Sequence, residues 1–421
     1  MIRLCLFDLD QTLVDTEDMQ VLREAGVHRN DAAYASEVRT SFRSRNRILI
    51  DETTLIQMQL NTPGLKFGVF TRSPRRYVDV ILASAYTLIN WDVVIAYEDV
   101  QQRKPNGEGI HRAMVAVGLG NPSELPHVLM VGDGDVDIRA AYNAGCRVAL
   151  FKKGWPQSYG RSQWRSLGLL PDMVLEDQDD LLSFASNPHH GLPELERALD
   201  AGIQASSRPR FDDIGKFFLG DTTRHVVQTA GRYFPFYETL SYRRGWHQLS
   251  QSIQANKEST VFPIEWIETI RRYVAFQYRF LTSMPFFGGS GPEVIITAVP
   301  ARPGRIHRLG NLIAQLQASY GHNLELNRLR LTFDPNVFAY RPGVQSQSHD
   351  HLTQEQRFAN VRDHLHVVNP AAAQGKKFLV IDDVSTSGAT LLYAKKYLLD
   401  AHANSVDCFS LAQTVSDPLR Y

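Results

Sequence analysis

Cysteine and long apolar segments are scarce in this chain of 421 residues. Its cysteines, Cys5, Cys146 and Cys408, lie far apart and fit no metal-binding spacing, so we interpret them as buried small residues in a reducing cytosol. The sequence has no run of about 20 apolar residues, which is the length that predicts a membrane span. The short apolar run at the N-terminus leads straight into Asp8 and Asp10, which is not typical of a signal peptide. We therefore expect a cytoplasmic protein with no membrane partner.

An excess of charge of one sign is missing as well. Lys and Arg together number 45, and so do Asp and Glu, so no global basic field would attract nucleic acid or an anionic membrane. Internal repeats of fixed period and low-complexity tracts are also absent. What is present is a composition of 43% hydrophobic and 21% charged residues, which is typical of a globular protein, and a length that predicts two or three domains.

The first candidate site follows the first apolar run. The segment Cys5-Leu6-Phe7 is of strand type and ends in Asp8 and Asp10, with the hydroxyl of Thr12 after them. On an extended chain the two carboxylates point the same way, and they repel each other unless a cation such as Mg²⁺ lies between them. One carboxylate could then attack a phosphoryl group while the other transfers a proton. Taken alone, the pattern fits a strand end with an Asx-type turn about equally well.

Later strand-type runs also lead into polar residues. The hydroxyl of Thr71 suits a phosphate oxygen, although an N-cap role is the alternative, which we favour for Ser73. Lys104 would offset the carboxylates and a phosphate, whose charge together exceeds what one Mg²⁺ neutralises. Asp133 could complete a metal site, and Asp137 could orient a ligand or Lys104.

Strand-type and helical segments alternate throughout residues 1–186, which predicts a doubly wound parallel sheet with its chemistry at the carboxyl ends of the strands. In order and spacing, the polar residues resemble the four motifs of the haloacid dehalogenase (HAD) superfamily: Asp8-x-Asp10-x-Thr12, Thr71, Lys104-Pro105 and Gly132-Asp133-x-x-x-Asp137. The resemblance implies a HAD-like Rossmannoid domain and a Mg²⁺-dependent phosphatase that acts through an aspartyl-phosphate.

The same resemblance implies a role for each residue. Asp8 would be the nucleophile and Asp10 the general acid and base, and an Asp at this second position marks phosphatases rather than dehalogenases. Thr71 and Lys104 would hold the phosphoryl oxygens. The candidate Mg²⁺ site consists of Asp8, the backbone carbonyl of Asp10, Asp133 and Asp137.

The lid that is usual in this superfamily lies between the first and second motifs. Here that insert spans residues 17–64, with helices expected near 18–25 and 32–42 and a small helical cap within about 17–53. A small cap leaves an open mouth. The expected substrate is therefore a phosphate ester, either a small molecule or a larger or protein-tethered one.

Residues 187–210 are polar and carry proline and glycine, which indicates a linker to a second domain at 211–421. A short helix over 192–201 could interrupt it, and we interpret His189-His190 as solvated rather than as metal ligands.

A second candidate site follows the apolar run 378–381. Asp382 and Asp383 come next, then a loop of small hydroxyl residues and glycine, then a helix expected from about Leu391. Such a loop can direct backbone N–H groups at a phosphate, while the two acids could bind ribose hydroxyls. The alternative is an ordinary strand–loop–helix turn.

This segment resembles the phosphoribosyl-pyrophosphate (PRPP) motif of type I phosphoribosyltransferases. The resemblance implies a second doubly wound parallel-sheet domain, with ribose bound by Asp382 and Asp383 and a mobile flap that opens at 327–332. The residues implied to cradle the 5′-phosphate are Ser385, Thr386, Ser387, Gly388, Ala389 and Thr390. The implied pyrophosphate-loop candidates are Ala301, Arg302, Arg305 and Arg308.

Within that class, the C-terminal half resembles the competence-associated ComF-like group most. The segment 240–245 resembles its early Leu-Lys-Tyr-x-Gly segment, but Ser241 replaces the lysine, Gln356 replaces a glutamate, and the paired-cysteine zinc module is absent. These departures concern the substrate rather than the fold. We interpret His349-Asp350-His351 as a solvated loop.

Together these patterns predict an α/β protein of two doubly wound parallel-sheet domains with two separate Mg²⁺-dependent sites. The first hypothesis is a bifunctional enzyme of nucleotide metabolism. Its C-terminal domain would transfer the phosphoribosyl group of PRPP to an unknown base or other nucleophile. Its N-terminal phosphatase would then remove a phosphate, which could be that of the phosphoribosyl product. The alternative is a phosphatase regulated by a C-terminal domain that only senses PRPP or a nucleotide.

Overall fold

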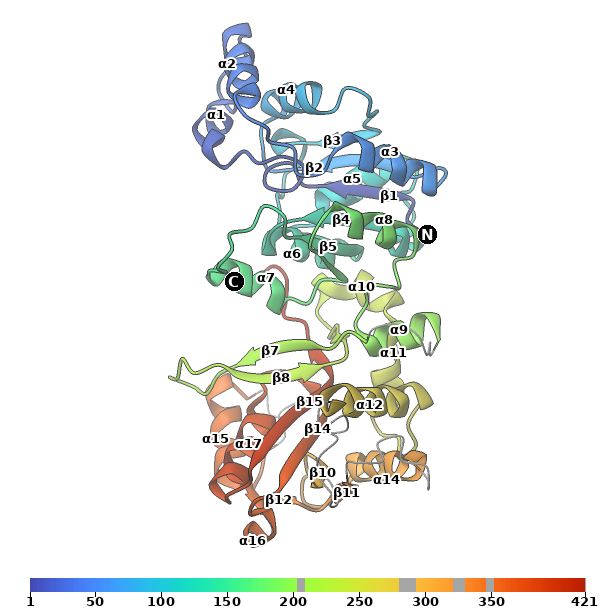
Figure 1. The fold of residues 1–421 in the computed structure, drawn as a ribbon, viewed down its shortest axis with the longest axis vertical. Coiled ribbons are helices and arrows are strands. Elements are labelled where there is room, and N and C mark those ends of the chain that lie inside the picture. Colours follow the sequence, from blue (N-terminus) through green and yellow to red (C-terminus); the bar gives the residue numbers. More distant parts are fainter. Residues whose placement is uncertain (203–208, 280–292, 321–329, 346–351, 421) are drawn as a thin grey trace. The chain divides into compact units, whose positions relative to one another are not determined.

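The computed structural model describes all residues except 203–208, 280–292, 321–329, 346–351 and 421 (Figure 1). The chain forms two compact units. The first unit consists of Met1–Leu192, Phe234–His247 and Ser416–Tyr421, and the second of Pro193–Tyr233 and Gln248–Val415. Two later segments of the chain therefore return to the first unit.

The first unit is built on a parallel six-stranded sheet, as its strand–helix alternation predicted. The strand order is β3-β2-β1-β4-β5-β6, which is the order of a doubly wound α/β sheet. The central strands are apolar throughout because helices cover both faces of such a sheet. The strands are β1 (Leu4–Phe7), β2 (Lys66–Phe70), β3 (Val93–Ile95), β4 (Val128–Gly132), β5 (Arg147–Phe151) and β6 (Met173–Leu175).

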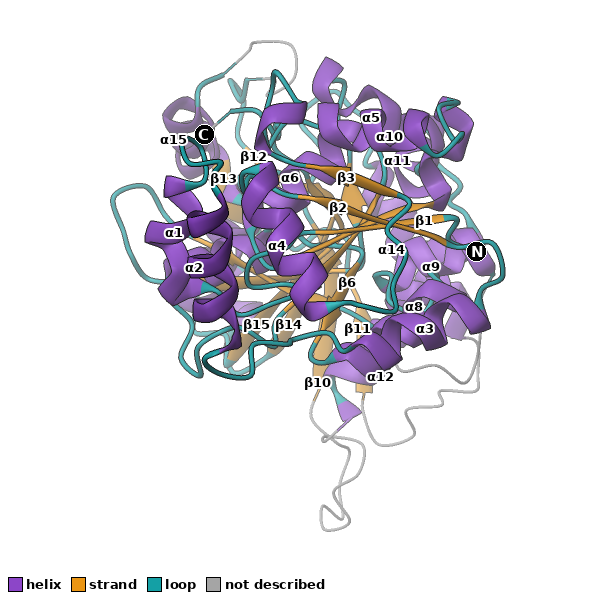
Figure 2. Cartoon of the chain, turned by 90° about the horizontal axis from the view of Figure 1, so that it is seen from above, coloured by secondary structure: helices purple, strands orange, loops and turns teal. Residues whose placement is uncertain are grey.

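The helices of the first unit include the two expected in the cap, α1 (Gln20–Ala25) and α2 (Ala32–Arg43), which lie side by side near α4 in both views (Figures 1 and 2). Asp31 and Asp51 begin α2 and α3, since each side chain accepts a hydrogen bond from a backbone N–H of the first turn. The remaining α-helices are α3 (Glu52–Asn61), α4 (Arg75–Ala85), α5 (Glu108–Ala116), α6 (Asp135–Ala144), α7 (Arg161–Gly168), α8 (Gln178–Ser186) and α10 (Ser241–Trp246). Short 3-10 helices are η1 (Glu17–Met19), η2 (Tyr97–Asp99), η3 (Pro122–His127) and η4 (Glu238–Leu240).

The second unit contains a mixed, mostly parallel sheet in the order β11-β10-β14-β15-β8-β7, with β9 paired to β15. The prediction of a fully parallel second sheet was wrong in one part, because β7 and β8 pair antiparallel. The connection from residue 217 to 224 is short, and a short connection can join antiparallel strands but not parallel neighbours. The strands are β7 (Asp212–Lys216), β8 (His225–Thr229), β9 (Arg232–Tyr233), β10 (Glu293–Ala298), β11 (Arg330–Phe333), β14 (Lys377–Ser385) and β15 (Ser405–Thr414); β12 (Phe338–Tyr340) and β13 (Leu365–Val367) form a separate antiparallel pair.

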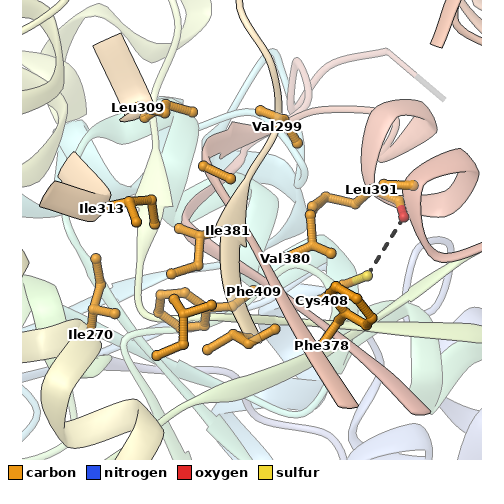
Figure 3. Packing of buried hydrophobic residues seen from close by; sticks show 14 of the residues in the cluster. Ile270, Val299, Leu309, Ile313, Phe378, Val380, Ile381, Leu391, Cys408 and Phe409 are labelled. Atoms are coloured by element: carbon orange, nitrogen blue, oxygen red, sulfur yellow. Dashed lines mark hydrogen bonds between the residues drawn. The ribbon is translucent and has the colours of Figure 1, made fainter. Parts of the chain in front are cut away.

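The core of the second unit holds β14 in place. Val380, Ile381 and Phe409 on the sheet are fully buried, and Figure 3 shows them among side chains of α12, α14 and α17. Each fully buried side chain of this size contributes about 1.5–3 kcal/mol. The helices are α9 (Glu194–Ala201), α11 (Gln248–Ala255), α12 (Ile264–Gln277), α14 (Arg308–Tyr320), α15 (Gln354–His364), α16 (Pro370–Ala373) and α17 (Ala389–Asp400).

The segment expected to be a linker contains α9, which matches the short helix considered for 192–201. Leu195 of α9 is buried in the second core, and Glu196 forms a buried ion pair with Arg232. This part of the segment is therefore packed rather than solvated, while 203–208 lie outside the described residues.

The three cysteines are buried free thiols, as expected. Burial raises the pKa of Cys146 and Cys408 to about 12, so both stay protonated at neutral pH. No helix in the described part of the chain combines the length and apolar composition needed to cross a membrane.

Candidate functional site

The predicted polar residues of the first unit converge at the carboxyl ends of its central strands. Asp8 follows β1, Thr71 follows β2 and Asp133 follows β4. Because β2, β1 and β4 are neighbours in the parallel sheet, these strand ends meet at one edge. They line a cleft of about 680 Å³ together with Asp10, Lys104 and Asp137.

Lys104 lies between two carboxylates of this cleft. Its Nζ donates to Asp8 Oδ1 and to Asp137 Oδ1, each at 2.7 Å, and only 1% of its side chain is exposed. Burial lowers the pKa of Lys104, but the charges of Asp137 and Asp8 outweigh it and raise the pKa above its usual value. Lys104 is therefore a fixed cation, and Asp137, whose Oδ2 also accepts from the N–H of Gly134 at 3.1 Å, holds it in position.

Asp8, Asp133 and Asp137 form an acidic cluster whose ligand oxygens all lie within 4.8 Å of one another. Burial raises the pKa of Asp8 to about 6, despite the opposing charge of Lys104. Burial, together with the charges of Asp137 and Asp8, raises the pKa of Asp133 well above its usual value. Carboxylate oxygens at this spacing suit a hard divalent cation, so the donor set fits Mg²⁺.

Asp10 lines the same cleft but has its own set of hydrogen-bond partners. Its Oδ1 accepts from Thr16 Oγ1 at 2.5 Å and from Tyr77 at 3.3 Å, and its Oδ2 accepts from Ser73 Oγ. Arg23 of the cap helix α1 reaches the same Oδ1 at 3.4 Å. Asp10 is only 8% exposed, so these contacts hold its carboxyl group in one orientation beside Asp8.

The N-cap role favoured for Ser73 was therefore wrong. Pro74 occupies the N-cap position of α4, and the Ser73 hydroxyl turns to Asp10 instead. The backbone N–H of Ser73 donates to Thr71 Oγ1 at 3.1 Å, which places the Thr71 hydroxyl at the start of the same loop.

Sequence reasoning missed the residues that surround Asp10. Thr16, Arg23 and Tyr77 carry no motif signal, because only the fold brings them to a residue up to 67 positions away. Two further arginines in the cleft, Arg103 and Arg165, were missed for the same reason. The only sign of Arg23 in the sequence is that it is a charged residue in the insert that follows the first motif.

The second predicted site lies at the end of β14. Arg308 forms an ion pair with Asp383, so this pyrophosphate-loop candidate already contacts a ribose-binding candidate. Burial and the charge of Asp383 raise the pKa of Asp382 well above its usual value. Gly388, at φ +78°, is the N-cap residue of α17 and closes the loop that starts at Ser385.

Other expectations for the C-terminal half changed in detail. Residues 330–332, expected to open a flap, are part of β11, which pairs in parallel with β10, and 327–329 lie outside the described residues. His349-Asp350-His351 also lies outside them. Ala301, Arg302 and Arg305 lie in the turn after β10, where the N–H of Arg305 donates to the carbonyl of Arg302 at 3.0 Å.

The segment 240–245, which resembled the start of a ComF-like domain, lies in the first unit. Arg243 is fully buried there, where it donates to the carbonyl of Cys146 at 2.5 Å and pairs with Asp172. Trp246 donates to the carbonyl of Gly145 at 2.8 Å. These contacts integrate the segment into the first unit through the loop between α6 and β5.

Comparisons with known proteins find similarity within the first unit. Residues 20–151 match the family model of haloacid dehalogenase-like hydrolases, a segment that includes Thr71, Lys104, Asp133 and Asp137 and begins after Asp10. A phosphoglycolate phosphatase of Salmonella choleraesuis is 35% identical over 138 residues, which cover 32% of this chain and 50% of that protein. The chain thus spans about half the length of this curated relative.

Two further similarities cover more of the relative. The pyrophosphatase PpaX of Bacillus cereus strain AH820 is 28% identical over 215 residues, covering 43% of this chain and 95% of that protein. A crystal structure described as a predicted phosphoglycolate phosphatase from Haemophilus somnus aligns with a TM-score of 0.34 and 19% identity, covering 44% of this chain and 97% of that one. The part of this chain at residues 20–151 is a haloacid dehalogenase-like hydrolase domain.

Proposed function

We propose that the first unit hydrolyses phosphomonoesters with Asp8 as the nucleophile. The observation that carries the proposal is the position of Lys104, which is buried and hydrogen-bonded to both Asp8 and Asp137, beside a separately oriented Asp10. A cation fixed against the nucleophile can stabilise the negative charge on the phosphoryl oxygens during transfer.

In the first half of the reaction, a carboxylate oxygen of Asp8 forms a bond to phosphorus while the bond from phosphorus to the leaving oxygen breaks. Asp10, in its protonated form, gives its proton to that leaving oxygen. In the second half, Asp10 takes a proton from a water molecule whose oxygen attacks the phosphorus. Inorganic phosphate leaves, and the Asp8 carboxylate is regenerated.

The other residues of the cleft bind and orient. Thr71 and Lys104 hold the non-bridging oxygens, and Thr16, Ser73 and Tyr77 keep Asp10 directed at the leaving oxygen. When bound by Asp8, the Asp10 carbonyl and Asp133, with Asp137 nearby, Mg²⁺ would neutralise charge on the phosphoryl group.

The substrate we propose is a small anionic phosphate compound. Arg23, Arg103 and Arg165 line the cleft in addition to Lys104, and they could bind a second acidic group of the substrate. Phosphoglycolate and pyrophosphate, the compounds in the names of the relatives, both carry such a group.

An activity assay with Mg²⁺ tests this proposal. Wild-type protein should release phosphate from 2-phosphoglycolate, pyrophosphate or p-nitrophenyl phosphate, and Asp8→Asn should abolish the release while the circular dichroism spectrum stays unchanged. Asp179→Asn, which changes an exposed carboxylate on α8 away from the cleft, should retain full activity. Turnover of the Asp8→Asn protein near that of the wild type would contradict the assignment of the nucleophile.

We propose as a second activity that the C-terminal unit binds PRPP and transfers its phosphoribosyl group to a base or other nucleophile. The supporting observation is the pair Asp382 and Asp383 at the end of a buried strand, followed by a loop that Gly388 closes at the start of α17. The acids would bind ribose hydroxyls, and the loop would bind the 5′-phosphate. Arg302, Arg305 and Arg308 remain the candidates for the pyrophosphate.

Pyrophosphate release from PRPP and Mg²⁺ across a panel of bases separates this proposal from the alternative of a PRPP or nucleotide sensor. A transferase releases pyrophosphate with one of the bases, and the double change of Asp382 and Asp383 to Asn abolishes the release. A sensor binds PRPP or a nucleotide in calorimetry without releasing pyrophosphate, and its ligand alters phosphatase turnover. A protein that shows neither behaviour at millimolar ligand would contradict both versions.

A further inference from the structure

A buried lysine lies against the loop at the start of α17. Lys216, the last residue of β7, is 7% exposed, and its Nζ donates to the carbonyl oxygen of Thr386 at 2.6 Å. Its side-chain stem lies against Gly388, since a Cβ added there would approach Lys216 Cγ and Cδ to 2.9 Å. Lys216 and this loop are 170 residues apart in sequence and both belong to the second unit.

Lys216 has no counter-charge in the described part of the chain. No carboxylate there forms an ion pair with it, and the residue opposite it on β8 is His225. Burial lowers the pKa of Lys216 to about 8, with no opposing acidic group. A buried, unpaired ammonium group is costly, and proteins normally pair it with an anion.

The loop beside Lys216 offers further donors of the kind an anion needs. Ser385 is 2% exposed, and its hydroxyl has no hydrogen-bond partner among the described residues. The helix α17, which spans Ala389–Asp400, begins at this loop and directs the positive end of its dipole at it. The N-cap residue Gly388 has no side chain to cap the helix, and the N–H of Ala389 donates to Ser387 Oγ at 3.4 Å. An ammonium group has three N–H donors, and Thr386 accepts one of them, so two remain for a ligand.

We propose that Lys216 supplies the cation of a phosphate-binding site formed by residues 385–389, in which the ligand anion is the missing counter-charge. The ligand class is a phosphomonoester, such as the 5′-phosphate of a phosphoribosyl compound; this part rests on the proposed function of the second unit. The carbonyl of Thr386 positions the ammonium group, and Gln413 Nε2, at 3.3 Å from the same oxygen, supports that carbonyl from β15. Asp382 and Asp383 precede the loop on β14 and would contact the sugar rather than the phosphate.

Calorimetric titration of the full chain with ribose 5-phosphate, inorganic phosphate and PRPP–Mg²⁺ tests the proposal. Lys216→Met should weaken binding of each probe roughly 10- to 100-fold, because a hydrogen bond to a charged group is lost. Lys216→Arg keeps the charge and should recover most of the affinity. Lys396→Met, which changes a half-exposed lysine on α17, should bind like the wild type.

Thermal unfolding with and without ligand gives a second readout, in which the change at Lys216 should weaken ligand binding but not the folded state. Lys216→Met removes an unpaired buried charge and should leave the melting temperature unchanged or higher, while the shift caused by ribose 5-phosphate should shrink. A lower melting temperature or loss of folding in this variant would overturn the proposal, because Lys216 would then serve the fold rather than a ligand.

The outcomes separate this inference from the function on which it rests. Binding of the probes that is sensitive to changes at Asp382 and Asp383 but not to Lys216→Met would overturn the role of Lys216 alone. Failure of the wild type to bind any of the three probes at millimolar concentration would overturn both.

Discussion

Replacing Lys104 by Met tests whether the acidic cluster of the first unit depends on its internal cation. The change removes two hydrogen-bonded ion pairs of 2.7 Å, and the side chains of Lys104 and Asp137 are only 1% and 2% exposed. It leaves Asp8, Asp133 and Asp137 together, with oxygens within 4.8 Å. Breaking a buried ion pair by removing one partner costs about 3–5 kcal/mol, so we expect the free energy of unfolding to fall by that amount.

The more exposed Asp8, at 15%, should contribute less to this loss than Asp137. Mg²⁺ should restore part of the stability, because a cation that binds the folded state at 100 times its dissociation constant adds about 2.7 kcal/mol. Phosphatase turnover should fall roughly 100- to 1000-fold, since a charge that stabilises the transferred phosphoryl group is lost. The recovery of stability without activity would separate the two roles of Lys104.

Urea unfolding monitored by tryptophan fluorescence is a suitable assay. Trp91, Trp155, Trp164 and Trp246 belong to the first unit, and Trp266 belongs to the second, so the signal reports mainly on the unit that is perturbed. Lys66→Met is the matched control, because Lys66 is 41% exposed in its ion pair with Asp92 and should contribute at most about 1 kcal/mol. Equal urea midpoints for Lys104→Met and Lys66→Met, with no effect of Mg²⁺, would refute the reasoning.

Three further predictions concern single contacts. Ser73→Ala removes a hydrogen-bond donor to Asp10 and should lower phosphatase turnover roughly tenfold without changing the fold. The control is Ser84→Ala, which removes a hydroxyl that donates to the carbonyl of Val80 on its own helix. Equal turnover of the two variants would show that Ser73 does not orient Asp10. Arg23→Gln should raise KM for 2-phosphoglycolate more than KM for p-nitrophenyl phosphate, because only the former has a second acidic group for the cleft arginines; parallel changes would exclude that contact. The pKa of Lys216 is about 8 in the folded state and higher in the unfolded state, so the unfolded chain binds more protons between about pH 8 and 10.5. The free energy of unfolding of the wild type should therefore rise with pH relative to that of Lys216→Met over this range. A difference in urea midpoints that stays constant with pH would contradict this prediction.

The architecture of the first site could be predicted because its signal is local. Apolar runs that end in Asp8, Thr71 and Asp133 mark strand ends, and parallel strands bring such ends to one edge of the sheet. The apolar runs at 65–70, 128–131 and 147–151 predict strands, and β2, β4 and β5 match these runs to within a residue at each end. The same logic located β14 and the helix after it, although α17 begins at Ala389 rather than near Leu391.

The predictions for the second sheet and for Ser73 were wrong because the pairing of strands and of side chains is not encoded in one short segment. The short segments 212–216 and 225–229 show no regular apolar alternation, so the sequence does not reveal that β7 and β8 form an antiparallel hairpin at the edge of the second sheet. Ser73 precedes a proline, which favours a cap, yet the hydroxyl bonds to Asp10 because the fold places a buried carboxylate beside it.

The sequence by itself determined the strand ends, the order of the motifs and the charged side chains at the first site. The reason is that apolar runs and the polar residues that follow them are properties of short segments. Only the tertiary structure decided which distant side chains pair, both in the sites and where the segment 240–245 joins the first unit. Tyr77 meets Asp10, Arg243 meets Asp172 and Lys216 meets Thr386 across 67, 71 and 170 residues. Such contacts depend on how sheets and helices pack against each other, and no local pattern of hydrophobicity specifies the partner of a polar residue.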